Sequence, residues 1–230
     1  LTYLPASPHN PFDGLPDRFR KRQAGQFGDL TSAYLNSLNY MDWIISSLIG
    51  QLRTSGLLDK TLIVITDDHG EMLGQNGGPV GHGWVVTPRL TNIPLIIMDP
   101  ARQSYTVNDT IGSQVDLLPT ILDRLHIPLP AGQIYQGTSL YSSNPDSLRF
   151  IYLNSLQQFA VIKGRELVCG DGESSGTQFP GSRYVMSNQD AQTIFTQIDD
   201  PDFALPTISQ FNEFQENFLA NYGHYCRLLQ

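Results

Sequence analysis

The chain contains a short apolar run that ends abruptly in acidic residues and a histidine. Residues 62–65 read Leu-Ile-Val-Ile, and Asp67, Asp68 and His69 follow directly after Thr66. An uninterrupted run of aliphatic, mostly β-branched residues is typical of a central strand that is covered on both faces. Ligands of open α/β sheets bind just beyond the carboxyl ends of such strands. The run therefore predicts a ligand site at a strand tip, with Asp67, Asp68 and His69 as candidate metal ligands.

The donor atoms of this tip indicate which ligand it would take. Carboxylate oxygens combined with an imidazole nitrogen favour zinc or manganese over calcium. Gly70 permits the sharp turn that would bring these donors together. A simpler interpretation is a polar turn whose aspartate caps a following helix. The Asp-Asp-His-Gly sequence alone does not separate these two alternatives.

Two further histidines stand in comparable positions among the five of the chain. His82 lies in the glycine-rich stretch Gly81-His-Gly, and His9 follows the apolar start of the chain in a proline-rich loop. A single loop histidine is usually only solvated. Three of them at strand ends and in a glycine loop predict a shared site formed by His9, His69 and His82.

The spacing of apolar residues predicts a long helix between two strands. The apolar positions of residues 29–55 recur at steps of three and four, which forms one continuous face. They are Tyr34, Leu38, Met41, Ile45, Leu48 and Leu52. With strands at 1–4 and 62–65 on either side, a β-α-β unit with parallel strands results, and His9 and His69 share one sheet edge. The predicted fold class is α/β, a mainly parallel sheet with helices on both faces.

The second half of the chain shows a different pattern. Short segments at 150–153, 159–162 and 166–168, separated by turns, predict a small antiparallel sheet. The expected domains are an α/β core at 1–148, an antiparallel β subdomain at 149–190 and a C-terminal helical extension at 191–230, with a helix over 208–222.

Composition limits the classes of partner. The net charge of −8 and the pI of about 4.9 argue against a nucleic-acid-binding surface. An anionic substrate would need local cations to offset the repulsion from this charge. Basic residues cluster only over residues 18–22, which is either a solvated loop or a surface for lipid headgroups. Cys169 and Cys226 are compatible with a disulfide and equally with two free thiols.

Several sequence motifs, in this order, resemble the alkaline phosphatase and sulfatase superfamily. They are His9-Asn-Pro-Phe12, Tyr34 to Asp42, Thr66-Asp-Asp-His-Gly-Glu71, His82-Gly83, Asn92 to Ile97 and Ser113 to Thr120. Their order and spacing over residues 1–165 carry the resemblance, since each motif alone is weakly specific. The likeness is closest to bacterial phosphoglycerol and phosphoethanolamine transferases of the lipoteichoic acid synthase type. It implies an incomplete alkaline phosphatase-like fold that continues outside this sequence.

The resemblance implies roles for the residues at the strand tip. Asp68 and His69 match the Asp-His metal ligands of the superfamily, and Asp67 stands where a serine is common. Glu71 matches an acid that would orient a ligand or the loop. The alternative for Glu71 is a helix-terminal charge favoured by the helix dipole.

The two other histidines have implied roles of their own. His9 and His82 match histidines that contact the phosphoryl group of the substrate or hold a second metal ion. They are therefore the candidate catalytic residues of this chain.

One departure from the superfamily pattern is large. Members use a threonine, serine or modified cysteine as nucleophile and a further acidic ligand, both from their N-terminal half, and nothing here corresponds to them. We therefore expect this chain to be the C-terminal part of a larger enzyme. By resemblance, that enzyme would act outside the cytoplasm and be anchored in a membrane by a segment outside this chain.

The resemblance favours a metal-dependent phosphoryl-group transferase or hydrolase acting on phosphodiester headgroups, through a covalent enzyme intermediate. Two alternatives stay open. A sulfatase would use calcium and a modified cysteine, although sulfatases often have asparagine at the position of His69. A non-catalytic relative would keep the fold and bind a lipid or a partner.

Overall fold

The computed structural model describes residues 2–5, 7–22, 29–74, 77–102, 104–128, 137–142, 150–155, 158–171, 182–189 and 192–198. The chain divides into two units. Unit 1 comprises Leu1–His82 and Ile93–Tyr105, and unit 2 comprises Gly83–Asn92 and Thr106–Gln230.

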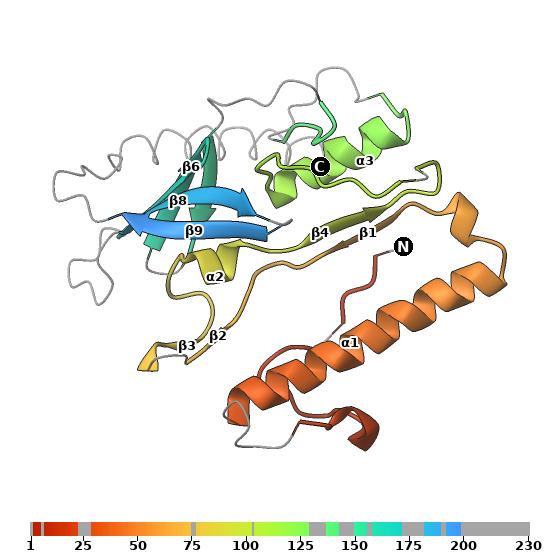
Figure 1. The fold of residues 1–230 in the computed structure, drawn as a ribbon, viewed down its shortest axis with the longest axis horizontal. Coiled ribbons are helices and arrows are strands. Elements are labelled where there is room, and N and C mark those ends of the chain that lie inside the picture. The colour runs from red at the N-terminus through yellow and green to blue at the C-terminus, as the bar shows by residue number, and fades with distance from the viewer. Residues whose placement is uncertain are drawn as a thin grey trace, which may run out of the picture. The chain divides into compact units, whose positions relative to one another are not determined.

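Unit 1 contains one long helix and two short pairs of strands (Figure 1). Its elements are η1 (Asp17–Phe19), α1 (Asp29–Thr54), η2 (Leu58–Lys60), β1 (Ile63–Thr66), β2 (Met72–Leu73), β3 (Val80–Gly81) and β4 (Leu95–Met98).

Helix α1 confirms the predicted helix, but its packing differs from the prediction. It ends before Gly56, which has a left-handed φ of 68° and donates its N–H to the carbonyl oxygen of Arg53 at 3.1 Å. The buried residues of α1 are Ser32, Asn36 and Ser37. The apolar face is only partly covered among the described residues, since Leu38 and Leu48 are exposed.

Strand β1 pairs antiparallel with β4, from Ile63 opposite Met98 to Thr66 opposite Leu95. The predicted full burial of this strand is wrong, because all four of its residues are only partly buried. Every strand pairing among the described residues is antiparallel. The sequence favoured a parallel sheet because an apolar run does not encode the direction of its partner.

The predicted strand at residues 1–4 is also wrong. Residues 2–5 form no strand, and the side chain of Leu4 is 84% exposed. A strand is stable only when a neighbouring strand takes up its backbone hydrogen bonds, and these residues have none in the described part of the chain. The β-α-β unit expected around α1 is therefore not formed by them.

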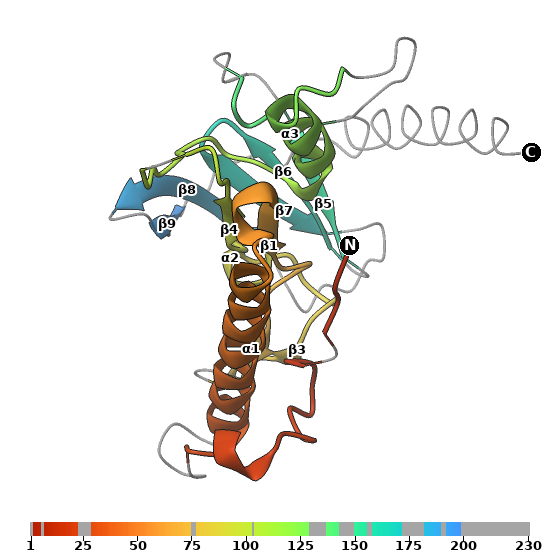
Figure 2. The ribbon, with the colours of Figure 1, turned by 90° about the vertical axis from the view of Figure 1, so that its right-hand side faces the viewer.

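Unit 2 contains a five-stranded antiparallel sheet in the order β5-β6-β7-β8-β9, with β5 to β7 side by side in Figure 2. Its strands are β5 (Phe150–Asn154), β6 (Gln158–Lys163), β7 (Glu166–Asp171), β8 (Ser182–Gln189) and β9 (Gln192–Ile198). The predicted antiparallel sheet is thus confirmed. It extends to residue 198, past residue 190 where the sequence placed its end, because β9 pairs with β8.

The remaining elements of unit 2 are α2 (Pro88–Thr91), η4 (Gln114–Asp116) and α3 (Leu117–Arg124). Asp116 is fully buried, and its carboxylate accepts hydrogen bonds from the N–H groups of Ser113 at 2.7 Å and Thr138 at 2.8 Å. This carboxylate ties the residues around 138 to the start of α3. The predicted helix at 208–222 and Cys226 lie outside the described residues.

Cys169 belongs to the core of unit 2 and is a free thiol in the described part of the chain. Burial raises its pKa to about 12. None of the described helices has the length and apolar character needed to cross a lipid bilayer.

The core of unit 2 predicts where stability is most sensitive. Leu167 is fully buried beside Ile162 and Met186. We expect Leu167→Ala to lower the free energy of unfolding by about 2–5 kcal/mol through the cavity it leaves. The matched control is Leu118→Ala, because Leu118 is half exposed on α3, and its expected effect is below about 0.5 kcal/mol. Urea unfolding followed by circular dichroism measures both, and equal losses would contradict this core assignment.

Candidate active site

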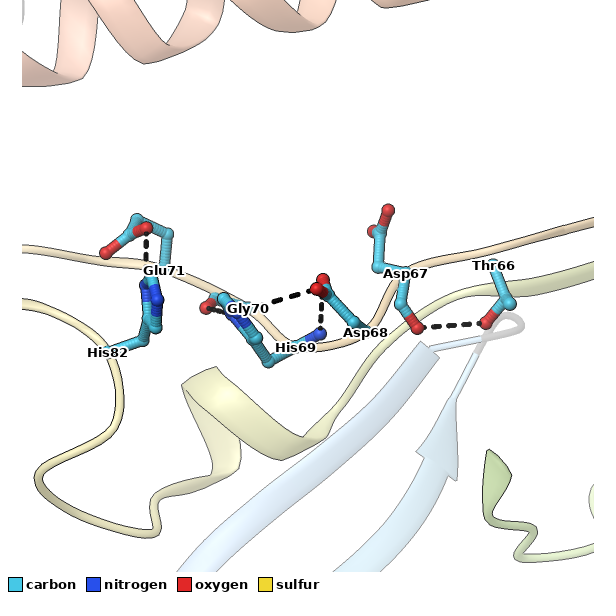
Figure 3. A network of polar contacts seen from close by, with 7 residues as sticks. All are labelled: Thr66, Asp67, Asp68, His69, Gly70, Glu71 and His82. Atoms are coloured by element: carbon cyan, nitrogen blue, oxygen red, sulfur yellow. Dashed lines mark hydrogen bonds and ion pairs between the residues drawn. The ribbon is translucent and has the colours of Figure 1, made fainter. Parts of the chain in front are cut away.

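The tip of β1 is held by its contact with the segment before β4. The Thr66 hydroxyl donates a hydrogen bond to the Pro94 carbonyl oxygen at 2.9 Å, beside the β1–β4 ladder. The chain then runs through Asp67, Asp68, His69 and Gly70 to Glu71 (Figure 3). The tip therefore starts from a position fixed by two strands.

Asp68 and His69 face one another. The Asp68 Oδ1 atom accepts the backbone N–H of His69 at 3.0 Å, and its Oδ2 atom lies 3.7 Å from His69 Nε2. His69 Nδ1 lies 2.8 Å from the Gly70 carbonyl oxygen. Because a carbonyl oxygen only accepts, Nδ1 is the donor in this contact, and Nε2 is the ring nitrogen on the side of Asp68. Metal-binding histidines are commonly oriented by this kind of contact.

Asp67 occupies a different side of the tip. Figure 3 shows its carboxylate pointing away from the carboxylate of Asp68. Partial burial raises its pKa, and the charge of Asp68 raises it further while His69 lowers it. No three His, Cys, Asp or Glu side chains of the described residues are placed so that they could hold a metal ion. Asp68 and His69 have suitable donor atoms for a divalent cation, but they form only part of a ligand set.

Glu71 and His82 form a close pair. His82 Nδ1 lies 3.1 Å from Glu71 Oε2, and the Glu71 side chain is 9% exposed. The other carboxylate oxygen, Oε1, is buried and has no hydrogen-bond partner in the described part of the chain. Glu71 leads directly into strand β2. A helix-terminal role for Glu71 and a helix-capping role for the tip aspartates are therefore both wrong, because no helix follows them.

The three predicted histidines lie close together. The ring centroids of His69 and His82 are 3.9 Å apart, and those of His9 and His82 are 6.0 Å apart. His9 Nδ1 lies 2.7 Å from the Asn10 carbonyl oxygen, so it also carries its proton there. In all three rings Nδ1 is engaged by an acceptor, and Nε2 is the atom that can reach a ligand.

The His9 loop is anchored on helix α1 by Phe12. Phe12 adopts an unusual left-handed φ of 61° and donates its N–H to the His9 carbonyl oxygen at 2.9 Å. Its side chain is 4% exposed and packs edge-to-face on Tyr34 at 5.3 Å. A turn and one buried ring thus hold His9 in place.

The sequence analysis placed Tyr34 on an apolar helix face and at the start of one of the resembling motifs, but gave it no role in the site. Its pKa is raised first by burial and then by the negative charges of Asp67 and Glu71. The Tyr34 hydroxyl therefore lies in the field of the acidic tip. Helical spacing cannot predict this effect. It shows which residues share a face of α1, but not which charged residues of the β1 tip lie near that face.

Comparison with known proteins identifies the family. The sulfatase family model matches residues 1–127, more than half of the chain. The low-salt glycan biosynthesis sulfotransferase Agl7 of Haloferax volcanii is 28% identical over 167 residues, covering 70% of this chain and 40% of that protein. Arylsulfatase K of Bos taurus is 30% identical over 150 residues, covering 63% of this chain and 26% of that protein.

A solved structure agrees with these relatives. The phosphonate monoester hydrolase of Silicibacter pomeroyi superposes with a TM-score of 0.55 at 25% identity, covering 68% of this chain and 34% of that one. The chain thus spans between about a quarter and two fifths of the length of these three proteins. None of the three is a phosphoglycerol transferase, so that finer resemblance stays a prediction. The chain belongs to the sulfatase family of the alkaline phosphatase superfamily.

Proposed function

We propose that the protein is a metal-dependent hydrolase of sulfate esters carried by a glycan, and that this chain contributes the histidine-rich side of its active site. The observation that carries the proposal is the convergence of His9, His69 and His82 beside Asp68 at one strand tip. The glycan is inferred from the name of the Haloferax volcanii relative, and the sulfate ester from the arylsulfatase.

Asp68 and His69 are the residues that would hold the metal ion in this proposal. A divalent ion bound there would supply positive charge to offset the negative charge on the oxygens of a sulfuryl or phosphoryl group. The chain spans 40% or less of its relatives, so we infer that the other ligands and the nucleophile of the covalent step belong to a part of the protein outside this sequence.

His9 and His82 act on the ester group in this proposal. Their Nδ1 atoms are engaged by the Asn10 carbonyl and the Glu71 carboxylate. Nε2 is then the atom left to contact an ester oxygen, and it donates a hydrogen bond when the ring is doubly protonated. Glu71 would orient the His82 ring through its 3.1 Å contact with Nδ1.

A phosphodiester headgroup is the second candidate substrate, as the resemblance to phosphoglycerol and phosphoethanolamine transferases implies. His69 favours it, since an imidazole ligand suits zinc or manganese, whereas calcium prefers oxygen donors. The phosphonate monoester hydrolase among the structural relatives also acts on phosphorus.

A substrate panel separates the two candidates. We expect the whole protein, loaded in turn with calcium, manganese and zinc, to hydrolyse p-nitrophenyl sulfate at least about tenfold faster than bis(p-nitrophenyl) phosphate at equal concentration. The reverse preference would support the phosphodiester candidate. Hydrolysis of neither ester with any metal would contradict both and would favour a binding role for the fold.

The metal-binding roles make a direct prediction. Asp68→Ala and His69→Ala in the whole protein should remove the bound metal and lower turnover at least about a hundredfold, because each deletes a ligand. Metal content by mass spectrometry and ester hydrolysis are the two measurements.

The matched control is Asp59→Ala, since Asp59 is an exposed carboxylate in η2 of the same unit. It should leave both readings unchanged. Full metal content in the Asp68 or His69 variant would contradict the assignment, whatever its activity.

The Glu71–His82 pair makes another prediction. Glu71→Ala should lower kcat by about 10- to 100-fold, because His82 loses the partner that orients it. Glu71→Gln keeps an oxygen that can accept from Nδ1, so it should retain more activity than Glu71→Ala. Steady-state kinetics of both variants test this, and equal loss in the two would show that the oxygen atom alone does not orient His82.

A further inference from the structure

Phe12 has a backbone conformation that its residue type disfavours. Its φ of 61° lies in the left-handed region, which glycine and asparagine adopt readily and a bulky aromatic residue seldom does. The other non-glycine residue with positive φ in the described chain is His126, which follows the end of α3, where a left-handed residue is common. Phe12 lies at no helix end. Such a conformation costs free energy and persists only where other contacts outweigh that cost.

Two contacts hold Phe12. Its N–H donates to the His9 carbonyl oxygen at 2.9 Å, and its buried ring packs edge-to-face on Tyr34 with the ring centroids 5.3 Å apart. The hydrogen bond closes the turn, but a turn of this kind forms whatever the φ of its last residue. Of these two contacts, the packing on Tyr34 is therefore the one that selects the left-handed value.

Tyr34 is a rigid support for this contact. It lies in the second turn of α1, in the part of the helix that contains the buried residues Ser32, Asn36 and Ser37. The Ser37 hydroxyl donates to the Tyr34 carbonyl oxygen at 2.6 Å. The backbone that carries the Tyr34 ring is thus fixed by α1 and by its buried neighbours.

The position of the His9 ring depends on the Phe12 turn. The His9 carbonyl accepts the Phe12 N–H, and the His9 ring lies 6.0 Å from the His82 ring, edge to face. His82 is placed independently, by the β2–β3 pairing and its contact with Glu71. His9 is therefore the member of this pair whose place relies on Phe12.

We propose that Tyr34 is a positioning residue for His9: its ring holds Phe12 in the left-handed conformation, which keeps the His9 ring beside His82. The inference rests on the proposed function for the action of His9 on the ester group, whereas the placing of the ring does not depend on it. Loss of the Tyr34 ring lets Phe12 return to negative φ, and the His9 ring then leaves its place beside His82.

The ring and the hydroxyl of Tyr34 can be tested separately. Burial raises the pKa of Tyr34, and the charges of Asp67 and Glu71 raise it further, so the hydroxyl is neutral at pH 7. Tyr34→Phe removes only this neutral hydroxyl and keeps the edge-to-face contact. Tyr34→Leu removes the aromatic ring but keeps an apolar side chain with high helix propensity.

The first measurement is NMR of the histidine rings in the full chain. Nitrogen chemical shifts report which ring nitrogen carries the proton, and proton–proton contacts report whether the His9 and His82 rings are close. We expect Tyr34→Leu to lose the His9–His82 contacts and to shift the His9 nitrogens toward the values of a solvated histidine. Tyr34→Phe should keep both signatures.

The second measurement is steady-state hydrolysis of p-nitrophenyl sulfate and bis(p-nitrophenyl) phosphate by the whole protein. Tyr34→Leu should lower kcat at least about tenfold and change KM less than about threefold, because a displaced His9 fails the transition state more than it fails the bound substrate. Tyr34→Phe should retain at least about half of kcat, since the ring contact remains.

The matched control is Tyr40→Leu. Tyr40 lies on the same helix, and its ring packs on Phe19 at 4.9 Å and on Trp43 at 6.1 Å. The substitution therefore removes a comparable aromatic contact that does not involve the His9 loop. It should leave the His9 signals in place and change kcat less than about twofold, as expected for a residue outside the site.

A second variant removes the same contact from the side of the loop. Phe12→Leu should displace the His9 ring as Tyr34→Leu does, and the double variant should add little to either single one, because both act on one contact. The dispersion of each NMR spectrum reports whether the variant is folded, and either single variant suffices for the test.

Three outcomes would overturn the inference. They are unchanged His9 signals in the folded Tyr34→Leu or Phe12→Leu variant, equal displacement in Tyr34→Phe and Tyr34→Leu, and equal displacement in Tyr40→Leu. Displaced His9 signals in a protein that hydrolyses neither ester would overturn the proposed function and leave the positioning role. Displaced signals with normal kcat would likewise keep the positioning role and overturn the assignment of His9 to the ester group.

Discussion

The candidate active site depends on the two-residue pairing between β2 and β3. Met72 pairs with Gly81 and Leu73 with Val80, so the chain that leaves the β1 tip returns to it at once. This pairing places His82 against Glu71 and brings its ring within 3.9 Å of the His69 ring. Without the β2–β3 pairing, the chain between residues 69 and 82 would not hold these two residues together. The β2–β3 pairing, the shortest among the described residues, thus positions two of the three histidines.

Three carboxylates, those of Asp67, Asp68 and Glu71, lie within five residues at the tip of β1. Burial raises the pKa of Asp67 and the charge of Asp68 raises it further, while the pKa of Tyr34 is raised by burial and then by the charges of Asp67 and Glu71. Glu71 also keeps one buried oxygen without a partner among the described residues. Burying a carboxylate costs free energy unless a cation or hydrogen-bond donor compensates it. Such a tip is poorly suited to a purely structural turn and well suited to binding positive charge.

The sequence by itself determined the local helices and strands and the candidate site residues. Periodicity placed α1, short segments separated by turns placed β5 to β7, and the polar residues after an apolar run placed the tip at Asp67, Asp68 and His69. These features are local, because they follow from side-chain spacing along a few turns or residues. The three histidine rings lie close together as the sequence predicted, although residues 2–5 do not form the strand that was used to group them.

Only the tertiary structure decided how these elements meet. The antiparallel direction of β1 and β4, the lack of a strand at residues 2–5 and the paired orientation of Glu71 with His82 depend on contacts between segments far apart in the chain. The effect of the Asp67 and Glu71 charges on Tyr34 has the same origin. A sequence pattern specifies which face of an element is apolar, but the partner that covers that face, and its direction, are set by packing in three dimensions.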